Sequence, residues 1–257
     1  MARYGMVIDL DRCMGCRACM EACKIENNTP MENFWMYVFR FEEEEYPQTY
    51  TWFMPRPCMH CDNAPCVKVC PVGARFKRED GLTATDWEHC IGCRYCAVAC
   101  PYGVNDFNWR KPSQTFYLDW DDKDLEPVIQ GEVPPYRNPD LDRPYGVEQR
   151  RIAGGGRYKG VVEKCTFCVH RIEKGLEPAC VANCPVRALH FGDLDDPNSE
   201  VTQFLLERHP FQLLEELGTE PRVYYVGGHP PGADTRQIEE VKTRVGAMTV
   251  PTREVES

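Results

Sequence analysis

The stretch Cys90-Ile-Gly-Cys-Arg-Tyr-Cys-Ala-Val-Ala-Cys-Pro101 is the part of the sequence from which the fold can be predicted. Its cysteines have the spacing C-x2-C-x2-C-x3-C-P, which is typical of chains that hold iron–sulfur clusters. In this pattern the first three thiolates ligate one cube, and the fourth ligates a second cube nearby. Gly92 allows backbone N–H groups to approach the sulfur atoms, and Pro101 ends the helical turn.

Related patterns occur four times in the 257 residues and together use all 16 cysteines. No motif has lost a cysteine, so we expect four [4Fe–4S] clusters rather than a mixture with three-iron forms. In chain order the groups are Cys13, Cys16, Cys19 and Cys23 (motif one); Cys58, Cys61, Cys66 and Cys70 (motif two); Cys90, Cys93, Cys96 and Cys100 (motif three); and Cys165, Cys168, Cys180 and Cys184 (motif four).

Disulfide bonds and structural zinc are the alternative roles for so many cysteines. Tandem cysteines two residues apart are poor disulfide partners, and the chain is large for a scaffold that disulfides hold together. Zinc is the stronger alternative because C-x2-C pairs are its usual ligands. However, zinc explains neither a third cysteine within the same short loop nor the repeated C-x3-C-P ending. An absorbance spectrum separates the two, since cubes are brown and zinc sites are colourless.

The net charge of −10 argues against nucleic acid as a partner. Residues 1–9 contain neither the apolar core of a signal peptide nor a twin arginine. No run of 18 apolar residues occurs, so the sequence predicts no membrane span and a chain that is soluble by itself. If the protein works outside the cytoplasm, we therefore expect a partner to carry it there already folded.

Motifs one and three are predicted to be the same structural unit used twice. A β-like apolar run, residues 4–10, precedes motif one. Motif one has Lys24 where the other motifs have proline, so its helix is predicted to continue toward Asn27. The residues that match between the two motifs are Asp9 and Asp86, Gly15 and Gly92, and Arg17 and Arg94.

Motif two leads into a predicted β-hairpin. After Cys70 the chain runs through Phe76 to a turn at residues 79–81 and returns through residues 82–85. The Asp-Gly pair in this turn suits the positive φ of a tight hairpin. The hairpin feeds directly into motif three. We expect His60, inside motif two, to be a loop residue rather than a ligand, since four cysteines are already present.

Motif four is predicted to play the role of motif two, because Pro185-Val-Arg-Ala-Leu-His-Phe191 echoes Pro71-Val-Gly-Ala-Arg-Phe76. It should therefore pair with motif one, as motif two pairs with motif three. The predicted fold class is α+β, with two nested bacterial-ferredoxin-like modules of two [4Fe–4S] clusters each. The first module combines residues 1–30 with 158–195, and the second is residues 50–112.

Two further regions complete the predicted organisation. Residues 113–157 are rich in Pro, Gly and Asp, which predicts an irregular insertion that is functional or ordered by a partner; a flexible surface excursion is the alternative. Residues 196–257 are predicted to be a C-terminal extension that docks on a partner. The acidic run at 42–45 predicts a solvated face, with docking to a basic partner as the alternative. The expected elements of the extension are a helix over 199–209, an edge strand over 222–226 and a weak helix over 235–245.

Five stretches accompany the motifs: Met6-Val-Ile-Asp-Leu10, Glu26-Asn-Asn28, Cys100-Pro-Tyr-Gly-Val104, Lys164-Cys-Thr-Phe-Cys168 and Gly192-Asp-Leu-Asp-Asp-Pro197. With the motif order, they make the chain resemble the iron–sulfur subunit of membrane-linked molybdopterin oxidoreductases, the dimethyl sulfoxide (DMSO) reductase superfamily. Polysulfide, tetrathionate and respiratory arsenate reductases have similar subunits. The resemblance covers residues 1–112 and 158–227, and the insertion and the tail fall outside it.

The resemblance implies electron transfer between a large molybdenum- or tungsten-pterin catalytic subunit and an integral membrane subunit that binds quinone. Clusters 1 and 2 would face the catalytic subunit, and cluster 4 would lie at the quinone end. The complex would be membrane-associated, on the periplasmic face by co-export or, alternatively, on the cytoplasmic face. The implied ligands are Cys13, Cys16, Cys19 and Cys184 for cluster 1; Cys23, Cys165, Cys168 and Cys180 for cluster 2; Cys58, Cys61, Cys66 and Cys100 for cluster 3; and Cys70, Cys90, Cys93 and Cys96 for cluster 4.

The sequence contains no nucleophile–base pair, Walker loop or dinucleotide fingerprint, so we expect no substrate chemistry in this chain. A free polyferredoxin that serves soluble oxidoreductases is the alternative function; the long insertion and tail argue against it. Basic side chains beside the ligands could raise the cluster potentials or could simply face water. They are Arg17, Lys24, Lys68, Arg94 and Lys164.

Overall fold

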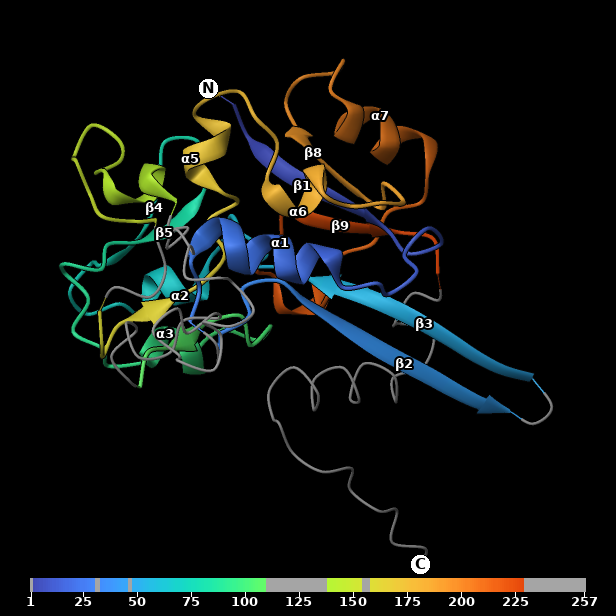
Figure 1. Ribbon diagram of the computed structural model, residues 1–257, viewed down its shortest axis with the longest axis horizontal. Coiled ribbons are helices and arrows are strands. Elements are labelled where there is room, and N and C mark those ends of the chain that lie inside the picture. The colour runs from blue at the N-terminus through green and yellow to red at the C-terminus, as the bar shows by residue number, and fades with distance from the viewer. Residues whose placement is uncertain (1, 31–32, 46–47, 110–137, 154–157, 229–257) are drawn as a thin grey trace, which may run out of the picture.

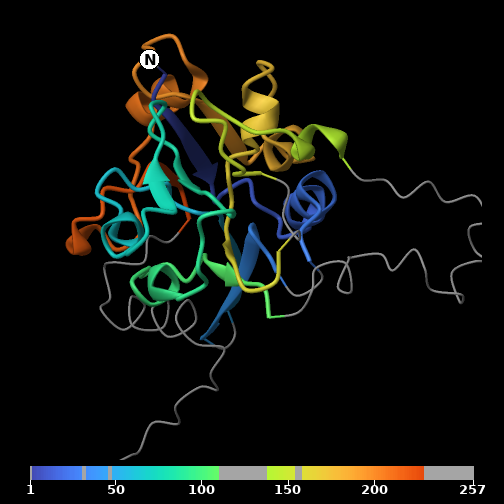
Figure 2. The ribbon, with the colours of Figure 1, turned by 90° about the vertical axis from the view of Figure 1, so that its left-hand side faces the viewer.

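The computed structural model describes residues 2–30, 33–45, 48–109, 138–153 and 158–228. In this part of the chain the structure is α+β, with short helices and four small sheets. Figures 1 and 2 place the sheet that contains the N-terminal strand at one end of the molecule, and helices α2 (Pro65–Lys68) and α3 (Tyr95–Val98) toward the other end.

The N-terminal strand β1 (Tyr4–Asp9) is the middle strand of a three-stranded sheet. Strand β8 (Leu189–Asp193) pairs with it in the antiparallel direction, and β9 (Val223–Val226) pairs with it in the parallel direction. Helix α7 (Glu200–Glu207) packs against this sheet (Figure 1). The sheet therefore joins segments from the start of the chain to its last described residues.

The apolar side chains of β1 lie on both faces of this sheet, because successive side chains of a strand point to opposite sides. Met6 and Ile8 are fully buried in the main apolar core. Val7, between them, is fully buried on the other side with Val201 of α7 and Val226 of β9. The run of apolar residues in β1 is thus explained by burial on both faces.

Helix α1 (Ala18–Asn27) carries the second half of motif one and packs against α6 (Ala179–Ala182) of motif four. The helix begins after Arg17 and ends before Asn28, and both of these residues have a left-handed backbone, with φ of 63° and 51°. The prediction that this helix continues to Asn27 is confirmed. The contact between α1 and α6 brings motif one and motif four together.

Strands β2 (Tyr37–Glu45) and β3 (Gln48–Arg56) form a long antiparallel hairpin that projects from the body of the molecule (Figure 1). Near the body, Phe41 stacks on Trp52 with ring centroids 4.2 Å apart. The acidic run of residues 42–45 forms the outer end of β2. The sequence analysis predicted no strands here.

Between motifs two and three the predicted hairpin is present. Its strands are β4 (Arg75–Lys77) and β5 (Thr83–Thr85), which pair in the antiparallel direction. The turn contains Gly81 with φ of 74°, a conformation that glycine adopts without steric cost. The hairpin joins the short helices α2 and α3, which contact one another. Their packing places motif two beside motif three.

The remaining short elements connect the parts. Strand β6 (Asp106–Phe107) pairs with β7 (Val162–Glu163), so the chain after motif three lies beside the chain that enters motif four. Helix α5 (Val169–Ile172) follows the first two cysteines of motif four. Short 3-10 helices lie at Pro139–Asp142 and Glu215–Leu217.

The backbone repeats the same local geometry in motifs one and three. Gly15 and Gly92 have φ of 69° and 71°, and Arg17 and Arg94 have φ of 63° and 61°. A Cβ atom at Gly92 would lie 2.0 Å from the carbonyl oxygen of Gly160, so only glycine fits at this position. These matching angles support the prediction that the two motifs are one structural unit used twice.

The strand predicted for residues 4–10 is confirmed as β1, the helix predicted for 199–209 as α7, and the edge strand predicted for 222–226 as β9. The helix predicted for 235–245 and most of the predicted insertion lie outside the described residues. In the described part of the chain, no helix is both long and apolar enough to cross a membrane.

Candidate metal centres

The three leading cysteines of motif two and the last cysteine of motif three line one cavity. They are Cys58, Cys61, Cys66 and Cys100. Burial raises the pKa of Cys61 to about 12, and the neighbouring charges of Cys58 and Cys100 act in the same direction. The structure therefore brings Cys100 to the three cysteines with which it was expected to share a cube.

A second cavity is lined by the last cysteine of motif two and the first three of motif three. These are Cys70, Cys90, Cys93 and Cys96. Arg75 of β4 also lines this cavity. The exchange of cysteines between motifs two and three is thus reciprocal.

The four cysteines expected to hold cluster 2 lie together in the interior and are all buried. Burial raises the pKa of Cys23 well above its usual range, and the charges of Cys165 and Cys168 raise it further. Burial likewise raises the pKa of Cys180, with contributions from Cys168, Cys23 and Cys165. Contact between α1 and α6 places Cys23 of motif one beside these three cysteines of motif four.

The four cysteines expected to hold cluster 1 are also neighbours, but they lie nearer the surface. Burial raises the pKa of Cys19 to about 12, and the charges of Cys13, Cys184 and Cys16 raise it as well. Cys16 is exposed, while Cys13 and Cys184 are partly buried. Cys184 of motif four therefore joins the first three cysteines of motif one.

Each of the four sets receives a backbone N–H···S hydrogen bond. A cube with four thiolates carries negative charge, so its burial needs donors and dipoles that point at the sulfur atoms. Together with the two cysteine-lined cavities, these donors show that the residues present fit [4Fe–4S] cubes. The donors are Phe167 N to Cys165 Sγ (3.4 Å), His60 N to Cys58 Sγ (3.5 Å), Arg75 N to Cys70 Sγ (3.3 Å) and Ala188 N to Cys184 Sγ (3.2 Å).

The side chain of Asn27 links two cysteines from different motifs. Its amide Nδ2 lies 3.6 Å from Cys23 Sγ and 3.5 Å from Cys168 Sγ, and it also donates to the Cys23 carbonyl oxygen. Asn27 is 1 % exposed. The sequence analysis quoted this residue only as part of a family stretch and assigned it no role.

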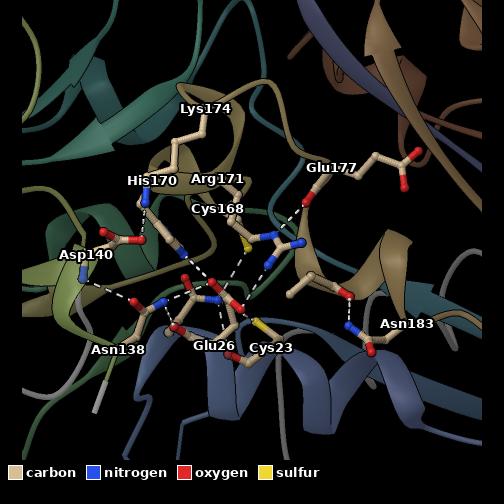
Figure 3. A network of polar contacts seen from close by, with 12 residues as sticks. Cys23, Glu26, Asn138, Asp140, Cys168, His170, Arg171, Lys174, Glu177 and Asn183 are labelled. Atoms are coloured by element: carbon tan, nitrogen blue, oxygen red, sulfur yellow. Dashed lines mark hydrogen bonds and ion pairs between the residues drawn. The ribbon is translucent and has the colours of Figure 1, made fainter.

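A polar network beside Asn27 ties three segments together (Figure 3). Glu26 Oε1 accepts a hydrogen bond from Asn138 Nδ2 (2.9 Å) and lies 2.7 Å from His170 Nε2, and Glu26 Oε2 accepts from Arg171 Nη1 (3.2 Å). The hydrogen bond with His170 is the main cause that lowers the pKa of Glu26. The network fixes the end of α1 against α5 and against residue 138, which belongs to the predicted insertion.

The five basic residues predicted near the ligands divide into two groups. Lys24 and Lys164 are each 2 % exposed, and their ammonium groups donate to backbone carbonyls, including Pro30 O and Cys165 O. Arg17, Lys68 and Arg94 are exposed. For Arg17 and Lys68, the alternative that they face water therefore describes the structure, whereas Arg94 also lines the cavity of the fourth set and stacks on Trp109.

The sequence analysis missed a buried cation, Arg75, which is 2 % exposed. Its Nη2 donates to Cys96 Sγ at 3.3 Å, and its backbone N–H donates to Cys70. Arg75 is five residues beyond Cys70 and is not adjacent to any cysteine in sequence. Only the path of the β4–β5 hairpin brings it to the cavity.

Electrostatic effects and helix contacts indicate which of the four sets are neighbours. Cys19 of the first set contributes to the raised pKa of Cys180 in the second set. Burial raises the pKa of Cys165 in the second set to about 12, and Cys58 of the third set is the strongest neighbouring charge. Helices α2 and α3, which carry Cys66 of the third set and Cys96 of the fourth, contact one another. These relations indicate the order 1, 2, 3 and 4.

Only two of the 16 cysteines, Cys16 and Cys93, are exposed. Each is accompanied by exposed apolar side chains, Met14 (59 %) beside Cys16, and Ile91 (63 %) and Val98 (80 %) around Cys93. The exposed cysteines belong to sets 1 and 4, at the two ends of the series. Exposed apolar groups of this kind are typical of surfaces that other proteins cover.

A family model described as a 4Fe-4S dicluster domain matches residues 49–116 and 144–194. A second model with the same description matches residues 12–74. Together the two matches include all four motifs and support four [4Fe–4S] clusters rather than zinc.

The chain is also similar to the iron–sulfur subunits of several reductases. It is 44 % identical to the iron–sulfur subunit of an arsenate respiratory reductase from Shewanella sp., over 87 % of this chain and 96 % of that protein. It is 42 % identical to a putative DMSO reductase iron–sulfur subunit from Halobacterium salinarum (89 % and 80 % covered). It is 36 % identical to the iron–sulfur cluster-binding subunit of a menaquinone reductase from Nitratidesulfovibrio vulgaris (87 % and 88 % covered).

Proposed function

The chain belongs to the iron–sulfur subunits of the DMSO reductase family, and from this membership we propose that it relays electrons between a molybdenum- or tungsten-pterin catalytic subunit and a quinone-binding membrane subunit. When bound, each [4Fe–4S] cube supplies reversible one-electron transfer. The chain's own residues hold the cubes, set their surroundings and provide the docking surfaces.

The proposed ligands follow the four sets of neighbouring cysteines. The two cysteine-lined cavities support the sets for clusters 3 and 4, and the mutual pKa effects support those for clusters 1 and 2. In this assignment the modules are nested, because motifs one and four enclose motifs two and three. The sets are Cys13, Cys16, Cys19 and Cys184; Cys23, Cys165, Cys168 and Cys180; Cys58, Cys61, Cys66 and Cys100; and Cys70, Cys90, Cys93 and Cys96.

The observation that carries the proposal is the exposure of the two end sets. A relay between two partners needs an entry and an exit at the surface, with its middle members shielded from water. Cys16 of set 1 and Cys93 of set 4 are exposed, whereas Cys23 of set 2 and Cys58 of set 3 are buried. A free carrier with a single partner at a time needs only one exposed end.

We propose that set 1 faces the catalytic subunit and set 4 faces the membrane subunit. The relatives named above are subunits of reductases, and one of their names contains menaquinone, which supports a quinone-linked partner. The apolar side chains of Ile91, Tyr95 and Val98 around set 4 would be covered by the membrane subunit. The periplasmic face stays a prediction, which protease access to the complex in spheroplasts tests.

Purification from membranes under anaerobic conditions tests this proposal. We expect the chain to co-purify with a large subunit that contains molybdenum or tungsten, and to hold about sixteen irons and sixteen sulfides per chain. Quinol should reduce the clusters in the complex but not in the isolated chain. A chain that purifies alone from the soluble fraction, with full iron and ready exchange with soluble oxidoreductases, would instead support the free polyferredoxin.

A further inference from the structure

Arg75 is a buried cation beside the fourth cysteine set. It lies at the start of β4, and its side chain is 2 % exposed. A buried guanidinium is costly unless opposite charges and hydrogen-bond acceptors surround it. The groups that surround Arg75 therefore indicate its role.

Arg75 contacts the fourth set twice. Its Nη2 donates to Cys96 Sγ at 3.3 Å, and its backbone N–H donates to Cys70 Sγ, also at 3.3 Å. It also lines the cavity that these two cysteines share with Cys90 and Cys93.

Two further donor atoms of the Arg75 guanidinium are available to a ligand. Its Nε and Nη1 atoms are buried and have no hydrogen-bond partner within the described part of the chain. Such donors are expensive to bury unless a ligand accepts from them. The sulfur atoms of a cube are acceptors of the required charge.

We propose that Arg75 is a redox-tuning residue of the fourth set: its guanidinium raises the reduction potential of the cube that Cys70, Cys90, Cys93 and Cys96 would hold. Each reduction adds a negative charge to a cube, and a fixed buried cation favours that reduced form. The N–H groups that Arg75 directs at Cys96 and Cys70 act in the same direction. This inference rests on the ligand sets in the proposed function.

Potentiometric titration of the loaded chain, followed by electron paramagnetic resonance, tests the inference. In Arg75→Met we expect one of the four potentials to fall, by at least about tenfold in the reduction equilibrium, or about 59 mV. The other three should not move. A Cys93→Ser background, which alters the cube of the fourth set, identifies the affected cube.

Lys68→Met is the matched control, since Lys68 is an exposed cation close to Cys70 in the sequence. We expect all four potentials to be unchanged in this variant. If Arg75→Met keeps sixteen irons but the potential of the cube held by the fourth set does not fall, the tuning role is wrong. Iron content and binding of the large subunit, measured on the same samples, test the proposed function separately.

Arg75→Lys covers the case in which Arg75→Met fails to take up iron. Lysine keeps the charge but loses the planar fork of donors. After exchange into D2O, pulsed resonance of the reduced protein should show weaker deuterium coupling at the cube of Cys96 than in the unaltered chain. The potential of that cube should fall by less than tenfold. Unchanged coupling together with unchanged potentials would overturn the inference.

Discussion

His60 and Phe167 stack on one another, with ring centroids 3.9 Å apart and an interplanar angle of 29°. They occupy the same position in two motifs, because each precedes the second cysteine of a C-x2-C pair. Both have a left-handed backbone, with φ of 45° and 51°, and the N–H of each donates to the first cysteine of its own pair. The stack therefore joins motif two to motif four through equivalent residues.

Phe167→Ala should destabilise the loaded chain by about 3–5 kcal/mol, because a 1 % exposed ring that packs on His60 and Phe191 is lost. In a chain of this size the melting temperature should fall by roughly 10 °C. Anaerobic thermal melting, followed by loss of cluster absorbance, measures this. Tyr95→Ala, which removes a 55 % exposed ring, is the control and should change little. Equal melting of the two variants would contradict a structural role for the stack.

Asn27→Leu should lower the potential of cluster 2, because two N–H···S contacts that favour the reduced cube are removed. Loss of a charge-assisted hydrogen bond of about 1–2 kcal/mol corresponds to roughly 40–90 mV for one electron. A redox titration of the loaded chain measures the change. Asn183→Leu is the control, since the amide of Asn183 donates to the carbonyl oxygen of Ala179 rather than to a cysteine sulfur. Equal potentials in both variants would show that Asn27 is only structural.

Cys100→Ser should damage the cube of Cys58, Cys61 and Cys66, although Cys100 belongs to motif three. The shared cavity is the reason for this expectation. Electron paramagnetic resonance should show a three-iron signal, or the loss of one four-iron signal, while the cube of motif three remains. Loss of the cube held by Cys90, Cys93 and Cys96 would mean that the proposed exchange between the motifs is absent.

Stability should fall as the pH rises through the range 4 to 7 because of Asp106. Burial raises the pKa of its carboxyl to about 7, against the opposing charges of Arg56 and Lys24. The folded chain then holds a proton that the unfolded chain releases near pH 4. The contribution of the protonated Asp106 carboxyl to stability is therefore full below about pH 4 and is lost by about pH 7.

Asp106→Asn should remove this pH dependence and stabilise the chain at pH 8 by up to roughly 4 kcal/mol. That value is an upper bound, because Arg56 and Lys24 lose a neighbouring negative charge. Melting temperatures at pH 5 and pH 8 measure the effect, with the exposed Glu207→Gln as control. A steeper pH dependence in Asp106→Asn than in the unaltered chain would contradict the assignment.

The direction of the relay can be tested in the assembled complex. Cys93→Ser should reduce quinone-linked turnover by roughly tenfold or more, because it alters the cube at the proposed quinone end. Turnover with an artificial dye that exchanges electrons near the catalytic subunit should largely survive. Cys16→Ser should instead impair both assays and the assembly with the large subunit. If Cys93→Ser abolished only the dye-linked turnover, the orientation would be reversed.

Local sequence spacing was sufficient to predict the four motifs and the β4–β5 hairpin. A C-x2-C-x2-C loop must place its thiolates close together, and an Asp-Gly turn must reverse the chain within a few residues. The matching backbone angles of Arg17 and Arg94 likewise reflect a repeat that was visible in the sequence. The similar segments after motifs two and four indicated which motifs pair, and the full ligand sets came from the family resemblance.

What depends on distant packing was missed. Arg75 is 21 residues from Cys96, and no local pattern connects them. The β2–β3 hairpin did leave a signal, because Tyr37, Phe39 and Phe41 alternate along the chain and their rings lie on one face of the strand. The stack of His60 on Phe167 could not be predicted, since it needs the two modules to be placed against one another.

The parallel pairing of β9 with β1 has a consequence for biosynthesis. Residues 6–9 find their partners at residues 223–226, so the ribosome must make nearly all of the described chain before this sheet can close. The cysteines of all four motifs are translated before residues 223–226. Until β9 pairs with β1, the sheet cannot fully bury Met6, Val7 and Ile8, which are fully buried in the finished fold. Closure of the sheet is therefore a late step that follows translation of every cysteine motif.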